Sequence, residues 1–413
     1  MSKVSSNIRD IVSRAAVSYL ERVGLLQDKE CVTNVDLELK LRKRNDLPEV
    51  YWAGVSFQDD ALGEDLKRQE IISCFVGHGS RGYLESQLLD QMDFILGNGL
   101  NEDWVIYDAV VDNSFITRIM KQVGIKEVKI TAPVTQLQIP QEFRAKYFVV
   151  SNQFKVTLYT HATQSKRAGV ELILALDEAG FNNMAAPIQT IESDKGMCLG
   201  LVSEYLGGGF QLESLVQTSI RDLFDFGGDP ANAGGDLSLE MKRLGETVAK
   251  LHTYLSEIYG SVPMDVKTFK DALTDSLTGI KESRQVNERL EALEGVSDVG
   301  ALFRVHGNLD ASSLIRTEMG WFVCDNGLLI EEVTQSPFFD ICKVLNSIDE
   351  IAQSILSEQS LADGDRLKIL TNAWLKRNKE AFLLGYLSGV EGRKIVPEDS
   401  EEFFNLAFVA GCL

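Results

Sequence analysis

Near the N-terminus, apolar residues recur every three or four positions along the chain. Ile8, Val12, Ala15 and Tyr19 follow this spacing, which predicts one amphipathic helix ending near Arg22. Such a helix either docks on its own domain, which is the commoner arrangement, or presents its apolar face to a partner.

The pattern then changes to alternation with a period of two. Apolar residues between Val35 and Leu41 alternate with Asp36, Glu38 and Lys40, as expected for a strand with one solvated face. These features predict a β-rich N-terminal unit. Its further strands are expected near residues 49–57, 70–76 and 104–110, with a closing helix at 114–123.

Two short polar segments are predicted to be turns. Residues 77–82 read Gly-His-Gly-Ser-Arg-Gly, so His78 is interpreted as a turn residue. Residues 146–159 contain two β-type runs separated by a short polar stretch, which indicates a hairpin.

The remainder of the chain is mainly helical in pattern. A helix is expected to begin at Glu171, and a strand follows at 198–202, before the glycines at 207–209. The fold class is therefore α+β, with most strands in the first half. Further helices are expected at 267–293, 337–349 and 374–386.

Composition limits the classes of partner. The 413 residues suggest two or three packing units, and 44% apolar residues are ordinary for a globular chain. A formal net charge of −20 argues against nucleic acid and against an anionic membrane surface as partners. The longest apolar stretch, residues 403–413, is too short to cross a bilayer, so we expect a cytoplasmic protein.

The six cysteines are scattered singly along the chain. Without Cys-x-x-Cys spacing, they indicate neither a zinc site nor a disulfide framework, and a reducing compartment is expected.

The stretch with the strongest chemical signal is a predicted strand, turn and strand at 303–325. His306-Gly307-Asn308-Leu309-Asp310 forms one polar cluster, and Asp325 follows the second strand. We expect the two clusters to lie at neighbouring loop positions. A second histidine, His252, is interpreted as satisfied within its own helical packing.

These motifs, in this order, resemble the aminoglycoside phosphotransferase branch of the protein-kinase-like superfamily, and within it the actinobacterial maltokinases. Residues 104–109, 218–224, 244–252 and 336–349 carry the resemblance beside the 303–325 motif. It implies a two-lobed protein-kinase-like fold with a β-rich cap at 1–125. The N-lobe would span 126–206 and end at a hinge, and the helical C-lobe would span 207–413.

The resemblance also implies roles for the 303–325 motif, with one departure. The family motif reads His-Gly-Asp, in which the Asp is the base for the sugar hydroxyl, whereas this chain has Asn308. His306 would brace the loop, and Asp310 is the neighbouring acid that would have to replace the base. Asp325 would hold magnesium, with Ser313 in place of a family Gln or Asn.

The nucleotide-binding residues of the family map onto the hairpin and hinge. Ser151 and Asn152 match the hairpin tip over the phosphates, and Thr157 occupies the place of the phosphate-gripping lysine. Lys155, two residues earlier on the same strand face, either substitutes for that lysine or is an ordinary solvated strand residue. Glu171 matches the helix glutamate that pairs with the lysine, or is a plain first-turn acid. The hinge positions match Glu204 and Leu206.

Two functions follow from this comparison. The preferred one is a catalytically impaired maltokinase-like protein, a pseudokinase, that serves as a binding or regulatory module in trehalose, maltose or glycogen metabolism. Its partner would be a trehalose-synthase-type enzyme or an active kinase. The alternative is an enzyme that uses ATP and Mg²⁺ to phosphorylate maltose or another sugar or amino sugar. The cofactors are accordingly ATP and Mg²⁺, or none.

Overall fold

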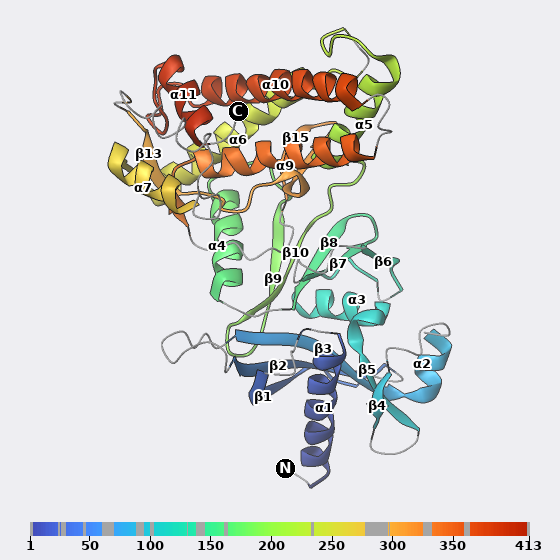
Figure 1. Ribbon diagram of the computed structural model, residues 1–413. Coiled ribbons are helices and arrows are strands. Elements are labelled where there is room, and N and C mark those ends of the chain that lie inside the picture. Colours follow the sequence, from blue (N-terminus) through green and yellow to red (C-terminus); the bar gives the residue numbers. More distant parts are fainter. Residues whose placement is uncertain are drawn as a thin grey trace. The chain divides into compact units, whose positions relative to one another are not determined.

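The chain folds into two compact units. The computed structural model describes residues 3–23, 25, 30–43, 47–59, 70–87, 95–99, 103–129, 131–137, 145–160, 164–232, 235–276, 296, 298–324, 333–358 and 364–410. The first unit comprises the described residues up to Glu171 together with Ala186–Gly207, and the second comprises Leu172–Ala185 and the described residues from Gly208 onward (Figure 1). The predicted three-part division at 125 and 206 stays a prediction.

The first unit begins with helix α1, Lys3–Arg22, followed by an antiparallel sheet. Its strands follow the order β1-β2-β3-β5-β4. The helix to Arg22 and the strands predicted in this region are confirmed. The bounds are β1 Glu30–Leu41, β2 Glu49–Asp59, β3 Glu70–Ser80, α2 Arg81–Gln87, β4 Ile95–Asn98 and β5 Trp104–Asp108, then a 3₁₀ turn at Ala109–Val111 and α3 Asn113–Gln122.

Strand β2 separates two apolar clusters by simple alternation. Tyr51 and Val55 pack with α1, whereas Val50 and Trp52 pack with α3. Successive strand side chains point to opposite faces, so one strand buries both of its faces. Helix α1 therefore docks on its own domain, as the commoner of the two expected arrangements.

His78 is not a turn residue, and the interpretation of residues 77–82 as a turn is wrong. Strand β3 continues to Ser80 and pairs His78 with Glu49, and the His78 side chain is buried against Trp104 at a ring-centroid distance of 4.7 Å. The neighbouring glycine is required by packing, because a Cβ at Gly77 would overlap the ring of Tyr107.

A second antiparallel sheet completes the first unit, in the order β6-β7-β8-β10-β9. The predicted hairpin is confirmed, and both Ser151 (φ 55°) and Asn152 (φ 53°) adopt the left-handed conformation that a tight hairpin turn needs. Side chains such as Phe148 and Leu158 join the cluster of Trp52 and α3, so the two sheets share one core. The bounds are β6 Val134–Leu137, β7 Ala145–Val150, β8 Phe154–Tyr159, β9 Pro187–Glu192 and β10 Cys198–Glu204.

Helix α4, Gln164–Glu178, starts seven residues before the predicted start. Glu171 is therefore a mid-helix residue, and its interpretation as a first-turn acid is wrong. The polar run Gln164-Ser165-Lys166-Arg167 hid this first part of the helix, because it lacks an apolar face that the periodicity could reveal.

The second unit is mainly helical, with two small three-stranded sheets, β11-β14-β15 and β12-β13-β16. Its helices surround one large apolar cluster that includes Trp321, Trp374 and Tyr386. The bounds are β11 Phe210–Gln211, α5 Leu212–Phe226, α6 Ser238–Tyr259, β12 Ser261–Pro263, α7 Val266–Ser276, β13 Ala301–Arg304, β14 Leu314–Thr317, β15 Gly320–Val323, β16 Thr334–Gln335, α9 Phe338–Ser357, α10 Gly364–Gly389 and α11 Ser400–Ala410. The helix predicted at 267–293 is confirmed to Ser276, and the rest lies outside the described residues.

Helices α6 and α10 touch through glycines. A Cβ at Gly245 would overlap the backbone of Phe382, and a Cβ at Gly385 would overlap the backbone of Lys242. Protein interiors are too densely packed to absorb such an overlap without displacing a helix.

Substituting Gly385→Ala is therefore expected to lower the free energy of unfolding by about 1–3 kcal/mol, the usual cost of overpacking. Urea denaturation followed by circular dichroism measures it. Gly364→Ala on the same helix is the control, because a Cβ there has nothing within 4 Å. An equal loss in both variants would contradict the packing argument.

Two further sequence expectations concern cysteines and membranes. Among the described residues, Cys74, Cys198 and Cys324 are free and buried. Among the described residues, no helix combines the length and the apolar character needed to cross a bilayer.

Candidate functional site

The loop that follows β13 is anchored by one buried carboxylate. Asp340, in the first turn of α9, is fully buried and accepts hydrogen bonds from the backbone N–H groups of His306 (2.8 Å) and Gly307 (2.9 Å). Its Oδ2 also lies 3.2 Å from Nε2 of His252. The conformation of the loop is therefore fixed by contacts to a helix that begins about 30 residues later in the sequence.

The charge on Asp340 is maintained despite its burial. Burial alone would raise the pKa of this carboxyl, but the hydrogen bond and charge of His252, with the charge and N–H of His306, hold the pKa below its usual range. His252 is itself held by Tyr386, whose Oη lies 2.8 Å from Nδ1. The expectation that His252 is satisfied within its helical packing is confirmed.

Asn308 lies next to a cation that the sequence motif did not reveal. The Lys343 ammonium donates to the Gly307 carbonyl at 2.5 Å and to the Asn308 side-chain Oδ1 at 3.3 Å. Lys343 is three residues after Asp340 on α9, so the two side chains leave the helix on neighbouring sides. The motif at 306–310 contains no signal for Lys343, because the contact forms only where Asp340 holds the loop on α9.

Asp310 and Ser313 are hydrogen-bonded to each other within one capped 3₁₀ turn. Asp310 caps the 3₁₀ turn Ala311–Ser313, and its Oδ1 accepts from the backbone and hydroxyl groups of both Ser312 and Ser313, at 2.6–3.2 Å. The Ser313 hydroxyl also lies 3.3 Å from the Asn308 carbonyl. Asp310 is thus positioned by its capping role, which turns Oδ1 toward its own loop.

The proposed metal position is incomplete in the described part of the chain. Asp325 lies outside the described residues, although Cys324 N–H donates to the Ser313 carbonyl at 2.8 Å and brings the end of β15 to this loop. Among the described residues, no group of three or more His, Cys, Asp or Glu side chains forms a metal site.

Thr157 and Lys155 lie on strand β8 of the predicted hairpin. Thr157 is buried in β8, opposite Tyr147 of β7, and Lys155 lies on the same face. The Lys155 ammonium stands 4.5 Å from the centre of the Tyr147 ring. Lys155 therefore makes a cation–π contact within its own sheet.

The remaining predicted nucleotide contacts lie at element ends and on an exposed helix surface. Glu171 is exposed on α4, and Glu204 is the last residue of β10 and is also exposed. The chain beyond Glu204 is held by Tyr205 N–H, which donates to the Gln153 carbonyl at the hairpin turn at 2.9 Å. Leu206 is half-buried directly afterwards.

The chain is similar in fold to solved structures, although the sequence identity is low. No family model matches the chain. A solved structure of glucosamine kinase in crystal form A aligns with 97% of this chain, and the alignment covers 90% of the glucosamine kinase chain, with TM-score 0.57 and 14% identity. A glucosamine kinase in complex with glucosamine, ADP and inorganic phosphate aligns with 92% of this chain and with 87% of its own length, with TM-score 0.56 and 14% identity. The chain has a two-lobed, kinase-like α+β fold. The predicted fold class is thereby confirmed.

Within this kinase-like fold, the chemistry open to the loop at Asn308 is limited by its functional groups. A carboxamide oxygen accepts a hydrogen bond from a hydroxyl, but it does not remove the proton near neutral pH. Asn308 and Lys343 therefore form a pair suited to binding and orienting polar ligands.

Proposed function

We propose that this kinase-like protein is catalytically impaired and acts as a binding or regulatory module for a sugar. The observation that carries the proposal is the Asn308 carboxamide, held by Lys343 in a loop that Asp340 otherwise keeps ordered. A well-anchored loop without a proton acceptor at its centre favours recognition over phosphoryl transfer.

The ligand class that we propose is an amino sugar, with maltose as the second choice. Glucosamine is named in the complex of the structural neighbour, and the net charge of −20 favours an ammonium-bearing ligand over an anionic one. A role in trehalose or glycogen metabolism, through a trehalose-synthase-type enzyme or an active kinase, belongs to the same proposal.

The second candidate is an ATP- and Mg²⁺-dependent kinase for an amino sugar. It is favoured by the fold neighbour that holds glucosamine, ADP and phosphate. Phosphoryl transfer relies mainly on positioning and charge neutralisation, so a chain without the base would retain a slow reaction.

Ligand titration with a turnover assay distinguishes the two. We expect glucosamine at about 100 times its Kd to stabilise the protein by about 2.7 kcal/mol, which is measurable as a rise in Tm. With ATP and Mg²⁺ added, ADP release should stay far below the roughly 1–100 s⁻¹ of active kinases.

A sugar alcohol of similar size serves as the control and should leave Tm unchanged. ADP release at kinase rates would sink the first proposal and support the second. No Tm shift with glucosamine or maltose would contradict the binding role.

A further inference from the structure

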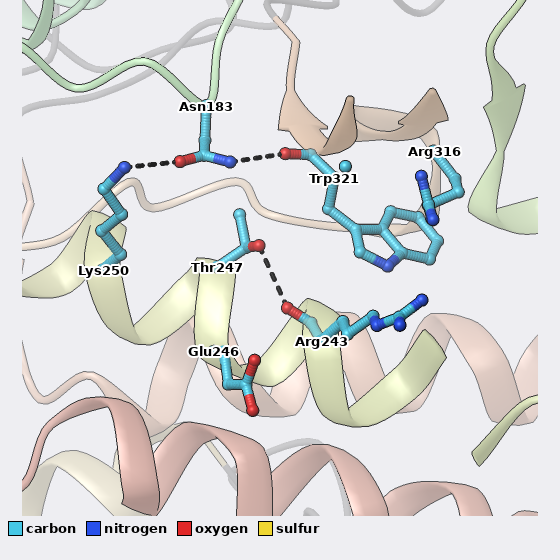
Figure 2. Close-up of a pocket in the computed structure, with 8 residues that line it drawn as sticks. Asn183, Arg243, Glu246, Thr247, Lys250, Arg316 and Trp321 are labelled. Carbon is cyan, nitrogen blue, oxygen red and sulfur yellow. Dashed lines mark hydrogen bonds between the residues drawn. The ribbon is translucent and has the colours of Figure 1, made fainter. Parts of the chain in front are cut away.

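A cavity of about 270 Å³ opens beside helix α6 in the second unit (Figure 2). One side of it is a single face of α6, because its helical lining residues follow three- and four-residue spacing. None of the described residues that line it belongs to the loop around Asn308. Its polar and aromatic lining comprises Arg243, Glu246, Thr247 and Lys250 of α6, Arg316 and Trp321 of the β14–β15 hairpin, and Asn183 of the loop between α4 and β9.

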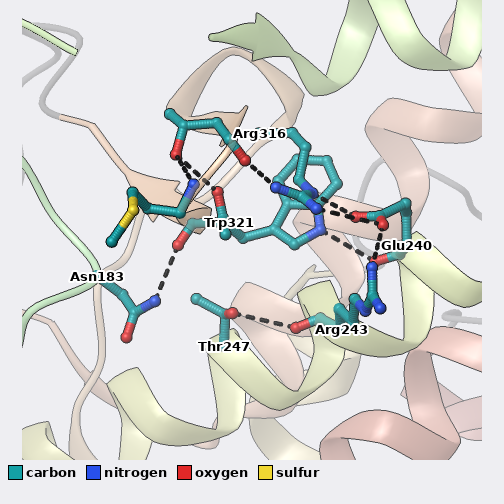
Figure 3. Close-up of polar contacts among 9 residues, drawn as sticks. Asn183, Glu240, Arg243, Thr247, Arg316 and Trp321 are labelled. Atoms are coloured by element: carbon teal, nitrogen blue, oxygen red, sulfur yellow. Dashed lines mark hydrogen bonds and ion pairs between the residues drawn. The ribbon is translucent and has the colours of Figure 1, made fainter.

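Two of the three cations share one carboxylate. Arg243 Nη1 lies 2.6 Å from Oε1 of Glu240, and Arg316 Nε lies 2.5 Å from Oε2 of the same side chain (Figure 3). Burial would raise the pKa of Glu240, but the hydrogen bonds and charges of Arg316 and Arg243 outweigh it and keep the pKa low. One negative charge therefore faces two positive ones.

The third cation has an uncharged partner. Lys250 Nζ donates to the Asn183 side-chain Oδ1 at 2.7 Å. Glu246 is the one carboxylate among the described lining residues. Together with Glu240, it gives two negative charges against three positive ones, so this part of a strongly acidic chain carries a local positive surplus.

The side chains are held in place before any ligand arrives. Asn183 Nδ2 donates to the Trp321 carbonyl at 3.0 Å, and Trp321 Nε1 donates to the Glu240 carbonyl at 3.1 Å. Arg243 is still half exposed, so the cation remains accessible from solvent. A pre-organised site loses less conformational entropy on binding.

We propose that this cavity binds a phosphate group, either free or as the monoester of a small molecule. Three cationic side chains from two elements match the three terminal oxygens of a phosphate better than the two oxygens of a carboxylate. Guanidinium groups suit phosphate geometry in particular. The volume lies just below the roughly 300–1,000 Å³ of typical small-molecule pockets, which suits a ligand of hexose phosphate size.

Calorimetric titration of the full chain with inorganic phosphate and with glucose 6-phosphate tests the proposal. We expect saturable binding, weakened about 10- to 100-fold by Arg243→Gln or Lys250→Gln, since each removes a charge-assisted hydrogen bond. Asn183→Asp, which is nearly isosteric, should weaken binding similarly by placing a carboxylate beside Lys250. Saturable binding of either probe supports the site. The probe that binds more tightly shows whether the ligand is free phosphate or a phosphate monoester.

Lys242→Gln is the matched control, because Lys242 is an exposed cation of the same helix that does not line the cavity. It should change affinity by less than about twofold, as expected for a screened surface charge. The proposal is overturned by absent binding at about 10 mM probe. Affinity unchanged in Arg243→Gln and Asn183→Asp, or equally reduced in Lys242→Gln, also overturns it.

Discussion

Replacing Asp340 with alanine is expected to lower the free energy of unfolding by about 3–5 kcal/mol, the cost of removing one member of a buried charged network. The substitution leaves the N–H groups of His306 and Gly307, and Nε2 of His252, without their acceptor. Urea denaturation measures the change. Glu350→Ala on the same helix is the control, since Glu350 is exposed and a surface substitution costs within about 0.5 kcal/mol.

The difference between wild type and Asp340→Ala should depend on pH in a definite direction. The folded-state pKa of Asp340 is lowered, so its stabilisation is present above the unfolded pKa of about 3.9 and is lost as pH falls through the folded value. The two proteins should therefore converge in stability in strong acid. A difference that grows as pH falls would contradict the assignment of Asp340 as a buried carboxylate.

Substituting Asn308→Asp is expected to raise ATP-dependent phosphorylation of glucosamine by about 100-fold or more, the usual contribution of a positioned base. Carboxamide and carboxylate have almost the same shape, so the anchored loop should accept the change. The Lys343 ammonium, 3.3 Å from Oδ1 of Asn308, would favour the ionised form of the new acid. Coupled measurement of ADP release gives the rate.

Asn346→Asp supplies the control for this gain. Asn346 is exposed on α9, so the same chemical change there adds a carboxylate outside the loop. We expect no change in rate. If Asn308→Asp also leaves the rate unchanged, the missing base is not what limits the reaction, and the buried Thr157 becomes the first residue to examine.

The periodic parts of the fold could be predicted from sequence because local spacing determines them. Alternation identified β1, and the run at 146–159 identified the β7–β8 hairpin together with its turn. His78 shows where this fails. Its flanking glycines look like turn residues, yet Gly77 is needed because the Tyr107 ring of a neighbouring strand leaves no space for a Cβ. A contact between strands about 30 residues apart leaves no local pattern.

In the candidate site, too, local motifs could be predicted from the sequence, whereas contacts between distant residues could not. Asn308 stands out because it interrupts a short motif, so the sequence alone shows it. The pairing of Asn308 with Lys343 depends on how Asp340 draws the loop onto α9, and no spacing rule links residues 35 positions apart. The cavity beside α6 could not be predicted from the sequence, because Arg243 and Lys250 have the spacing of ordinary solvated helix charges. Only the folded β14–β15 hairpin brings Arg316 close to them.

The shared core of the two sheets in the first unit limits how this protein could have diversified. Trp52 and Phe75 of the N-terminal sheet occupy the same apolar cluster as Phe148 and Leu158 of the hairpin sheet. A descendant that lost the N-terminal sheet would expose those hairpin side chains to water. Such a loss would require compensating polar replacements along β7 and β8, so the two sheets are expected to be inherited together.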